Sequence, residues 1–285
     1  MRSLLFVPAD SERKIDKALG CGADVIILDL EDSVAPQNKP DARKLAAQVL
    51  ARPRPEGIRI FVRINALDTG LTVDDLDAVT PGKPDGLIQP KTATGGCVEQ
   101  LAAMVGNTMP IIAIGTETAK AMFGLGSYHK LKAKLLGLAW GAEDLSNELG
   151  AQANRTPDGL LTEPYRLART LCLYGARAAG IDPVDTVYVD FRNQAGLEAD
   201  CIEAVRDGFT CKMAIHPAQV EVINRVFTPS PGQVEEANRI IEAFAKADNA
   251  GVVGIDGKMY DIPHLNRSKK LIQRARQYGV GGSVM

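Results

Sequence analysis

Short apolar runs without alternation of polar and apolar residues recur along this sequence and narrow the folds open to it. Strands that are covered on both faces have this pattern. Segments with the apolar spacing of amphipathic helices separate the runs, for example Lys39–Leu50 and Pro164–Ala179. Eight strands that alternate with helices predict an α/β protein, and specifically a closed (β/α)8 TIM barrel. The predicted strands are Ser3–Pro8, Asp24–Glu31, Arg59–Asn65, Gly86–Lys91, Pro110–Glu117, Leu135–Gly141, Asp185–Asp190 and Lys212–Pro217.

An open, doubly wound sheet is the alternative arrangement for such a series of strands and helices. The dinucleotide-binding form of that sheet carries a glycine-rich turn directly after its first strand. Here Val7-Pro8-Ala9-Asp10 stands at that place. The absence of these glycines favours the barrel.

The regular alternation of predicted strands and helices ends after Val226. We therefore divide the chain into a barrel at residues 1–228 and a C-terminal extension of helices and a hairpin at residues 229–285. The extension is short for an independent fold, so we expect it to pack on the barrel or on a neighbouring subunit. Its predicted elements are a turn at Pro229–Gly232, a helix to about Lys246, a hairpin at Gly251–Tyr260 centred on Asp256-Gly257, and a helix at Pro263–Tyr278.

Polar residues gather at the carboxyl ends of the predicted strands, although fully buried strands are expected to be apolar throughout. In a barrel these ends share one rim, and barrel enzymes build their active sites there. Any one of these residues could instead be a solvated loop residue or a turn cap. Together they predict a charged cluster at the rim. The polar series is Asp29, Glu31, Asp32, Arg63, Asn65, Lys91, Glu117, Asp144, Asp190 and His216, and Pro8 marks the end of the first strand.

Several carboxylates in one partly buried place need cations, because burial of an uncompensated charge is costly. Glu117 and Asp144 are candidate ligands for Mg²⁺, which commonly takes one or two carboxylates and fills its other positions with water and substrate. The alternative is a set of ion pairs to Lys91 or Arg63 without a metal. The three histidines are far apart and form no HxH or HxxxH pattern, which argues against a histidine-rich zinc or iron centre.

Composition excludes several other classes of protein. The formal net charge is −2 and no long basic stretch is present, so a nucleic-acid partner is not expected. The five cysteines form no CxxC pair, which indicates reduced thiols rather than a zinc site or a disulfide framework. The apolar run Leu4–Val7 stops at Pro8 and is too short for a signal peptide, and no run approaches a membrane span. We expect a soluble, cytoplasmic protein that does not bind membranes.

Seven segments of the chain resemble, in order, motifs of the citrate lyase β-subunit-like proteins. These belong to a wider group that includes citryl-, malyl- and citramalyl-CoA lyases and the HpcH/HpaI aldolases. The resemblance covers about residues 2–265, and its strength lies in the order and strand-appropriate spacing of the motifs. The segments are Arg2–Ala9, Asp24–Val34, Val62–Asn65, Pro90-Lys91, Glu117-Thr118, Gly141–Leu145 and Ile215–Gln219.

The resemblance implies a Mg²⁺-dependent carbon–carbon lyase that acts on a small keto acid and a coenzyme A thioester. It implies that Glu117 and Asp144 hold the metal and that Arg63 grips the carboxylate of the keto acid. Glu31 and Asp32 would lie just outside the metal ligands and belong, with Arg63, to the expected catalytic residues.

Further substrate contacts follow from the same likeness. The turn formed by Gly141, Ala142 and Glu143, up to Asp144, is expected to hold the keto acid through backbone amides, as turn N–H groups commonly hold anions. Lys91 is expected to contact substrate as well.

Three residues outside the rim have counterparts in the family. Asp261 matches an aspartate that, in many relatives, an adjacent subunit brings over the barrel mouth, and it is our candidate for the catalytic acid and base. It could equally be a helix N-cap ahead of Pro263. Arg13 and Lys17 resemble positions that contact the phosphates of coenzyme A, although they could also be merely solvated. The likeness implies a homo-oligomer, with a trimer favoured.

Cys211 is a departure from the family pattern, which usually has a glycine before the lysine that corresponds to Lys212. A cysteine cannot adopt left-handed backbone conformations as readily as glycine, so the local geometry could differ. Cys211 lies near the start of a predicted strand, away from the rim, and is not expected to be a nucleophile.

The sequence is also compatible with functions other than a coenzyme A-dependent lyase. The chain could be a metal-dependent aldolase that acts on free keto acids without coenzyme A. It could also be a subunit of a citrate lyase complex that acts on an acyl carrier protein thioester, or a non-catalytic binder of acyl-CoA. The identity of the acyl-CoA substrate depends on the shape of the pocket and is not predicted.

Overall fold

Eight parallel strands close into a barrel in the computed structural model, which describes residues 1–247 and 250–280. The strands follow one another in chain order, and β1 pairs with both β2 and β8. This closure confirms the predicted (β/α)8 barrel and excludes the open sheet. The strands are β1 (Ser3–Pro8), β2 (Val25–Asp29), β3 (Arg59–Arg63), β4 (Gly86–Gln89), β5 (Ile111–Ile114), β6 (Leu135–Ala139), β7 (Asp182–Asp185) and β8 (Cys211–Ala214).

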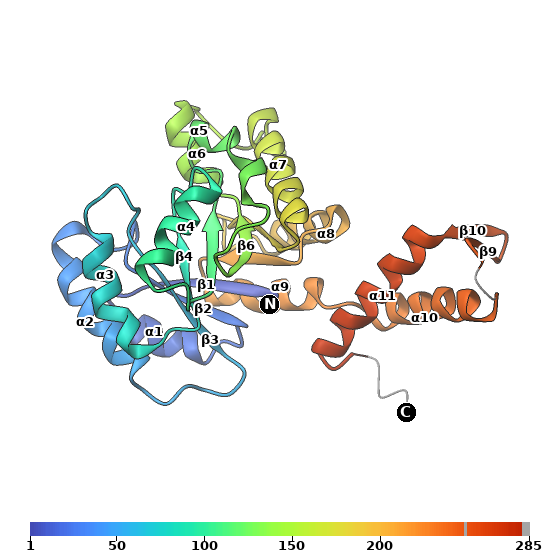
Figure 1. The fold of residues 1–285 in the computed structure, drawn as a ribbon, viewed down its shortest axis with the longest axis horizontal. Coiled ribbons are helices and arrows are strands. Elements are labelled where there is room, and N and C mark those ends of the chain that lie inside the picture. Colours follow the sequence, from blue (N-terminus) through green and yellow to red (C-terminus); the bar gives the residue numbers. More distant parts are fainter. Residues whose placement is uncertain (248–249, 281–285) are drawn as a thin grey trace. The chain divides into compact units, whose positions relative to one another are not determined.

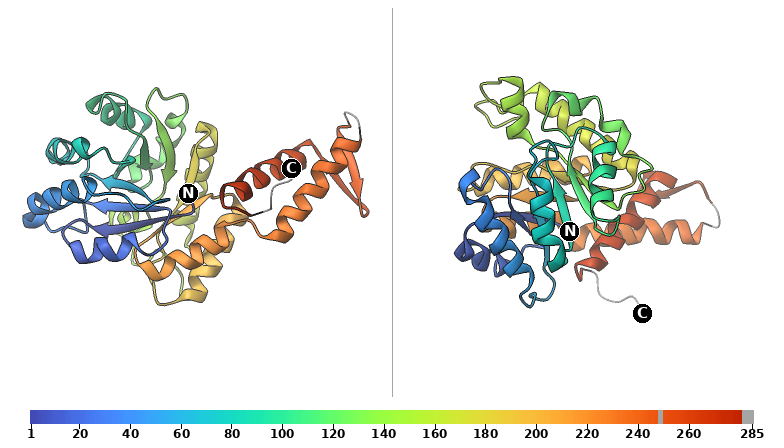
Figure 2. Two further views of the ribbon diagram at one scale, coloured as in Figure 1. Left: turned by 90° about the horizontal axis from the view of Figure 1, so that it is seen from below. Right: turned by 60° about the vertical axis from the view of Figure 1, so that its left-hand side comes forward.

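Helices surround the strands, as Figures 1 and 2 show. Each contributes an apolar face to the outside of the barrel; in α7, for instance, Ala168, Cys172 and Ala176 are fully buried at helical spacing. The helices of the barrel are α1 (Glu12–Leu19), α2 (Lys39–Leu50), α3 (Thr72–Val79), α4 (Gly95–Met104), α5 (Ala119–Met122), α6 (Ala142–Leu149), α7 (Glu163–Ala179), α8 (Gln194–Asp207) and α9 (Val220–Phe227).

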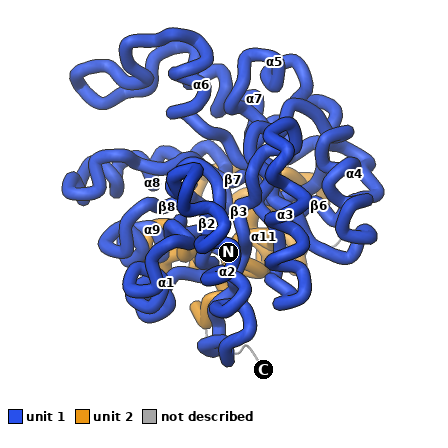
Figure 3. Tube along the Cα trace, turned by 90° about the vertical axis from the view of Figure 1, so that its left-hand side faces the viewer, with its two compact units in different colours: residues 1–224 blue, residues 225–285 orange. Residues whose placement is uncertain are grey.

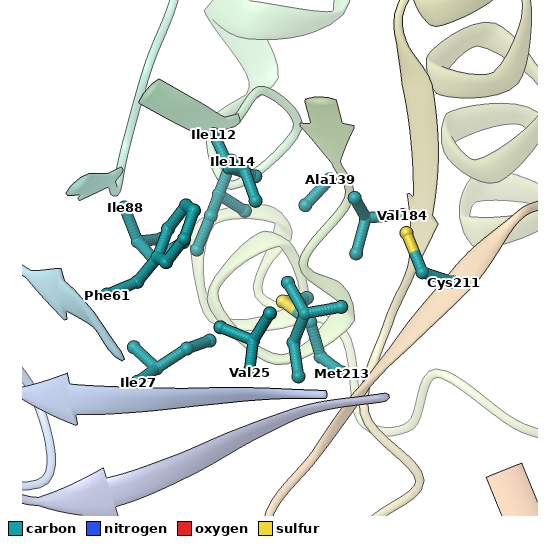
Figure 4. Close-up of a cluster of buried hydrophobic side chains, with 11 residues drawn as sticks. Val25, Ile27, Phe61, Ile88, Ile112, Ile114, Ala139, Val184, Cys211 and Met213 are labelled. Carbon is teal, nitrogen blue, oxygen red and sulfur yellow. The ribbon is translucent and has the colours of Figure 1, made fainter. Parts of the chain in front are cut away.

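The interior of the barrel is a packed core of alternate strand residues (Figure 4). Val25 and Ile27 of β2 point inward, whereas Ile26 and Leu28 are buried on the outer face, which explains why the strands read as continuous apolar runs. Cys211 belongs to this inner cluster at the start of β8 and is fully buried. Its backbone has no positive φ, so replacement of the family's glycine causes no left-handed strain.

The first strand has the predicted bounds, but the other seven end earlier than predicted. β2 ends at Asp29 and β5 at Ile114, because the sheet ladder stops while the chain stays buried: Leu30 and Ile64 are fully buried beyond the last strand residues. An apolar run therefore extends past the hydrogen-bonded strand. As a result, most of the polar rim residues lie in the loops that follow the strands.

The prediction for the seventh strand was wrong. β7 is Asp182–Asp185, not Asp185–Asp190, so Asp190 does not follow a strand end. Pro183 lacks a backbone N–H and normally counts against a central strand, and β7 begins and ends with an aspartate, so Val184 is its only aliphatic core residue. The true strand therefore lacks the signals that mark the other seven.

The chain forms two compact units, residues 1–224 and 225–285 (Figure 3), and the boundary lies within α9. The second unit contains α10 (Pro231–Lys246), β9 (Val252–Ile255), β10 (Lys258–Asp261) and α11 (Ile262–Gln277). The predicted hairpin is confirmed, with Asp256 and Gly257 both at positive φ as a two-residue hairpin turn requires. The turn predicted at Pro229–Gly232 is shorter, because Ser230 caps α10 and the helix begins at Pro231.

Among the described residues, no disulfide joins any two of the five cysteines. Within residues 1–247 and 250–280, no helix combines the length and the apolar character needed to cross a membrane.

Candidate metal and substrate site

A cavity of about 420 Å³ lies at the carboxyl ends of the barrel strands. Its wall has a charged part, supplied by the segments from β2 to α6, and an apolar part, supplied mainly by β1, β7 and β8. The lining residues are Phe6, Asp29, Asp32, Ser33, Arg63, Ile114, Glu117, Gly141, Ala142, Glu143, Asp144, Asn147, Thr186, Val187, Met213 and Ile215.

Asp29 and Arg63 form a bidentate ion pair at the ends of two neighbouring strands. The parallel register places them opposite each other, with Nε–Oδ1 and Nη2–Oδ2 distances of 2.7 and 2.6 Å. Asp29 is fully buried, and burial alone would raise the pKa of its carboxyl group, but Arg63 outweighs that effect and lowers it. The guanidinium group of Arg63 also lies over the ring of Phe6. Arg63 is thus held rigidly at the cavity wall.

Glu31 and Lys91 form the next ion pair of the cluster. Lys91 Nζ donates to Glu31 Oε1, lies 3.1 Å from Asp32 Oδ2 and 3.8 Å from Asp144 Oδ1. The second oxygen of Glu31 lies 2.9 Å from Arg63 Nη1 but has no partner with hydrogen-bond geometry among the described residues. Burial raises the pKa of the Glu31 carboxyl group, and the nearby cations do not fully offset it.

Glu117 is a buried carboxylate without an ion pair among the described residues. Its Oε2 accepts a hydrogen bond from the backbone N–H of Lys91, which adopts a left-handed conformation with φ 49°. Burial raises the pKa of Glu117 well above its usual value, and the neighbouring charges of Glu31 and Asp144 raise it further. A non-glycine residue in this conformation costs energy and is often found at functional sites.

Asp144 lies in the first turn of α6 rather than at a strand end. The helix begins after Gly141, whose N–H donates to Thr116 Oγ1 at 3.0 Å. A Cβ atom at Gly141 would lie 2.9 Å from Glu117 Cγ, so only glycine lets the turn approach Glu117 this closely. The first amides of a helix have no intrahelical partners, so the Ala142, Glu143 and Asp144 N–H groups are available to an anion.

The donor set suits a hard dication such as Mg²⁺. The five carboxylates of the cluster, which are Asp29, Glu31, Asp32, Glu117 and Asp144, outnumber its two ion-paired cations, Arg63 and Lys91. Among the described residues, no three His, Cys, Asp or Glu side chains form a ready cage for a metal. Mg²⁺ commonly takes only one or two carboxylates from a protein, and Glu117 and Asp144 are the candidates. The alternative of ion pairs alone applies to Asp144, but it leaves the Glu117 carboxylate uncompensated.

The structure does not bring all the predicted residues to the cavity. Arg13 and Lys17 are exposed on α1, which follows β1 at the mouth end of the barrel, and neither lines the cavity. Asp261 belongs to the second unit and is the N-cap of α11, where it accepts from the backbone N–H of His264 in a reciprocal capping box. The hydrogen bond from His264 lowers the pKa of its exposed carboxyl group.

The hydrogen bonds of Lys39 were not predicted. Its Nζ donates to Leu30 O, Glu31 O and Asn65 Oδ1 at 2.7, 2.9 and 2.7 Å, and so fixes the loop that carries Glu31. A lysine at the start of a helix is usually solvated, and only the fold reveals these partners. Thr186 was also missed, because the seventh strand was misplaced by three residues.

Fold and site together define an α/β-barrel protein with a carboxylate-rich cavity at its mouth. The chain belongs to the HpcH/HpaI aldolase/citrate lyase family, which matches residues 2–217. It is 38% identical over 277 residues to a (3S)-malyl-CoA thioesterase of Cereibacter sphaeroides, covering 96% of this chain and 94% of the relative. It is 34% identical over 292 residues to the citrate lyase subunit beta of Escherichia coli, covering 98% and 94%.

A solved structure supports the same relationship. The protein CitE from Mycobacterium tuberculosis, in complex with magnesium, acetoacetate and coenzyme A, superimposes with a TM-score of 0.83 at 32% identity and covers 96% of this chain and 98% of its own. The similarity therefore includes the extension as well as the barrel, and it confirms the family predicted from the seven motifs.

Proposed function

We propose that this protein is a Mg²⁺-dependent lyase that cleaves or forms the carbon–carbon bond of a 3-hydroxyacyl-CoA, such as citryl-, malyl- or citramalyl-CoA. The products of cleavage are a keto acid and an acyl-CoA. One observation carries the proposal: Glu117 is a buried carboxylate that forms no ion pair with any residue that the structure describes. It lies next to Glu31 and Asp144, in a cavity that is also lined by apolar residues. The solved relative that holds magnesium, acetoacetate and coenzyme A adds support.

Glu117 and Asp144 are the residues that would hold Mg²⁺, with Glu31 and Asp32 next to them. When bound, Mg²⁺ would supply Lewis-acid polarisation of the substrate oxygen. Arg63, fixed by Asp29 and Phe6, presents positive charge to the keto-acid carboxylate without the entropic cost of ordering a free side chain. It also stabilises negative charge that develops as the carbon–carbon bond breaks.

The substrate would be oriented by the first turn of α6 and by Lys91. The amides of Ala142, Glu143 and Asp144 can hold a carboxylate oxygen of the keto acid, as helix N-termini hold anions. Lys91 balances Glu31, Asp32 and Asp144, and its charge is retained because these carboxylates raise its pKa more than burial lowers it. The apolar wall at Val187, Met213 and Ile215 excludes water from the reacting carbon.

The proposal also covers the residues that contact coenzyme A, the oligomeric state of the protein and its cellular compartment. Arg13 and Lys17 are exposed in the first and the last turn of α1, and they would contact the phosphates of coenzyme A. A homotrimer would let Asp261 of one subunit reach the cavity of another, which agrees with its place on a unit separate from the barrel. Free thiols suit a reducing compartment such as the cytoplasm.

The test is an assay of the purified protein on citryl-, malyl- and citramalyl-CoA with and without Mg²⁺. We expect a keto acid and an acyl-CoA from at least one substrate, only when Mg²⁺ is present. The relative named (3S)-malyl-CoA thioesterase favours a second candidate, hydrolysis of the thioester, which would release free coenzyme A thiol and no keto acid. Turnover of an acyl carrier protein thioester alone would instead favour a citrate lyase subunit, and turnover of free keto acids a coenzyme A-independent aldolase.

Asp261→Asn should separate the two readings of Asp261. Asparagine caps a helix about as well as aspartate, so the thermal stability of the variant should match wild type. It cannot transfer a proton, so kcat should fall by about 10²- to 10⁴-fold if Asp261 is the acid and base. Asp261→Ala, measured alongside by thermal unfolding and turnover, loses both functions. Wild-type kcat in Asp261→Asn would leave only the capping role.

A further inference from the structure

Lys212 is a fully buried lysine that the proposed mechanism does not use. Its neighbours Cys211 and Met213 point into the barrel, so the alternation of β8 directs Lys212 outward, toward the helices. Its Nζ lies 2.7 Å from Asp185 Oδ2 on β7 and 2.7 Å from Asp200 Oδ2 on α8. Lys212 does not line the cavity at the mouth. Its position therefore excludes direct contact with a substrate in that cavity.

The two carboxylates that Lys212 joins hold the two ends of one segment, residues 140–155. Asp185 Oδ1 accepts from Trp140 Nε1 at 2.7 Å, at the start of the segment. Asp200 Oδ1 accepts from Arg155 Nη2 at 2.8 Å, at its end. Lys212 thus occupies the centre of a continuous bridge from one end of the segment to the other.

This segment carries the part of the site that belongs to α6. It contains Asp144 and the first-turn amides, and Asn154 near its end donates to Glu143 Oε1 at 2.7 Å. A displacement at Arg155 would therefore be transmitted to the residue next to Asp144. Trp140 is fully buried directly before the turn at Gly141.

Lys212 and Asp200 keep their charges at neutral pH. Burial lowers the pKa of Lys212, but Asp185 and Asp200 outweigh burial and raise it. Burial raises the pKa of Asp200, but Lys212 and Arg155 outweigh it and bring it to about 2. Arg169 adds a longer contact of 3.4 Å to Asp185 Oδ1. The bridge is a hydrogen-bonded structure at neutral pH rather than a proton donor.

We propose that Lys212 is a positioning residue for the metal site, which fixes both ends of the segment 140–155 through Asp185 and Asp200 and so holds Asp144 beside Glu117. This inference rests on the proposed role of Glu117 and Asp144 as metal ligands. Residues that orient metal ligands typically change metal affinity by about 10- to 100-fold when they are replaced.

The experiment compares Lys212→Met with wild type in the full-length protein. Mn²⁺ binding, measured by electron paramagnetic resonance, reports on the site without turnover, and Trp140 is the only tryptophan of the chain, so its fluorescence reports on the bridge. We expect the Kd for Mn²⁺ to rise about 10- to 100-fold in Lys212→Met. We also expect Trp140 emission to shift to longer wavelength and become more accessible to acrylamide. Lys44→Met, an equivalent change on the exposed face of α2, should alter neither.

Two further variants separate positioning from general stability. Lys212→Met combined with Asp200→Asn removes a buried carboxylate that has lost one of its two cationic partners and keeps only Arg155, so it should regain thermal stability without regaining Mn²⁺ affinity. Recovery of both together would mean that Lys212 acts through stability alone and would overturn the proposal. Arg155→Met frees only one end of the segment and should raise the Kd for Mn²⁺ by a smaller factor. It provides the decisive measurement if Lys212→Met does not fold.

Failure of the positioning role of Lys212 and failure of the proposed metal site would give different results. Wild-type Mn²⁺ affinity and Trp140 emission in a folded Lys212→Met overturn the positioning role and leave the proposed function intact. A wild-type protein that binds no Mn²⁺ contradicts the proposed function and, with it, the positioning of a metal site. Hydrogen exchange of residues 140–155 would still show whether Lys212 holds the segment.

Discussion

Glu117→Gln should abolish Mg²⁺-dependent turnover, with a fall in kcat/KM of at least about 1,000-fold, while the protein remains folded. The glutamine keeps the size of the side chain and can still accept the hydrogen bond from the Lys91 amide, but it removes the charge that would bind the metal. Steady-state assays over a range of Mg²⁺ concentrations measure the effect. Glu235→Gln, on the exposed face of α10, is the matched control. Undiminished activity in Glu117→Gln would remove the metal assignment.

The same variant should be more stable than wild type when no divalent metal is present. Burial and the charges of Glu31 and Asp144 raise the folded-state pKa of Glu117 above its usual 4.5. The folded state then binds a proton more tightly than the unfolded state, so wild-type stability falls as pH rises from about 4.5 through the folded pKa. Glu117→Gln lacks this loss, and Mg²⁺ should stabilise only the wild type. Urea unfolding between about pH 4 and 8, with and without Mg²⁺, tests both statements; equal pH slopes would contradict the first.

Arg63→Met should lower the free energy of unfolding by about 3–5 kcal/mol and abolish keto-acid binding. The substitution leaves the fully buried Asp29 carboxylate without its bidentate partner. Arg63 lowers the pKa of Asp29 in the folded protein, so the pair stabilises the fold above pH 3.8 and this stabilisation is lost as pH falls through the folded pKa. The difference between variant and wild type should therefore shrink toward low pH. Urea unfolding measures the stability, and calorimetric titration with a keto acid measures binding.

Arg63→Met combined with Asp29→Asn distinguishes the structural effect from the binding effect. The second substitution removes the unpaired charge, so most of the lost stability should return. Keto-acid binding should not return, because the guanidinium group is still missing. A single Arg63→Met variant that unfolds at the wild-type urea concentration would show that the buried pair contributes little.

The barrel was predictable because its signal is local and repeated. Most strands are recognisable in the sequence as apolar runs. The polar residues that follow these runs lie close together in the folded protein because the barrel closes. β7 was not predicted correctly because a proline and two aspartates, Asp182 and Asp185, are unusual in a buried strand. Only its pairing with β6 and β8 defines it as a strand. Strand ends were placed too late because Leu30 and similar residues stay buried outside the ladder.

The gathering of the rim residues at one cavity was predictable, but the pairs that they form were not. Arg63, Glu117 and Asp144 follow from their positions and from the family resemblance. The Asp29 to Arg63 pair depends on the register between two strands, which the sequence does not reveal. The partners of Lys212 lie on β7 and on α8, and no pattern in the sequence links these positions.

Lys91 supports Glu117 with its main chain and faces three other carboxylates with its side chain. Any amino acid except proline has the amide that Glu117 needs, although the positive φ of this position disfavours β-branched side chains. Substitution by an unbranched residue can therefore alter the charge of the pocket while the anchor of Glu117 survives. A family that diversifies its substrates can therefore vary this side chain at little risk to the neighbouring glutamate.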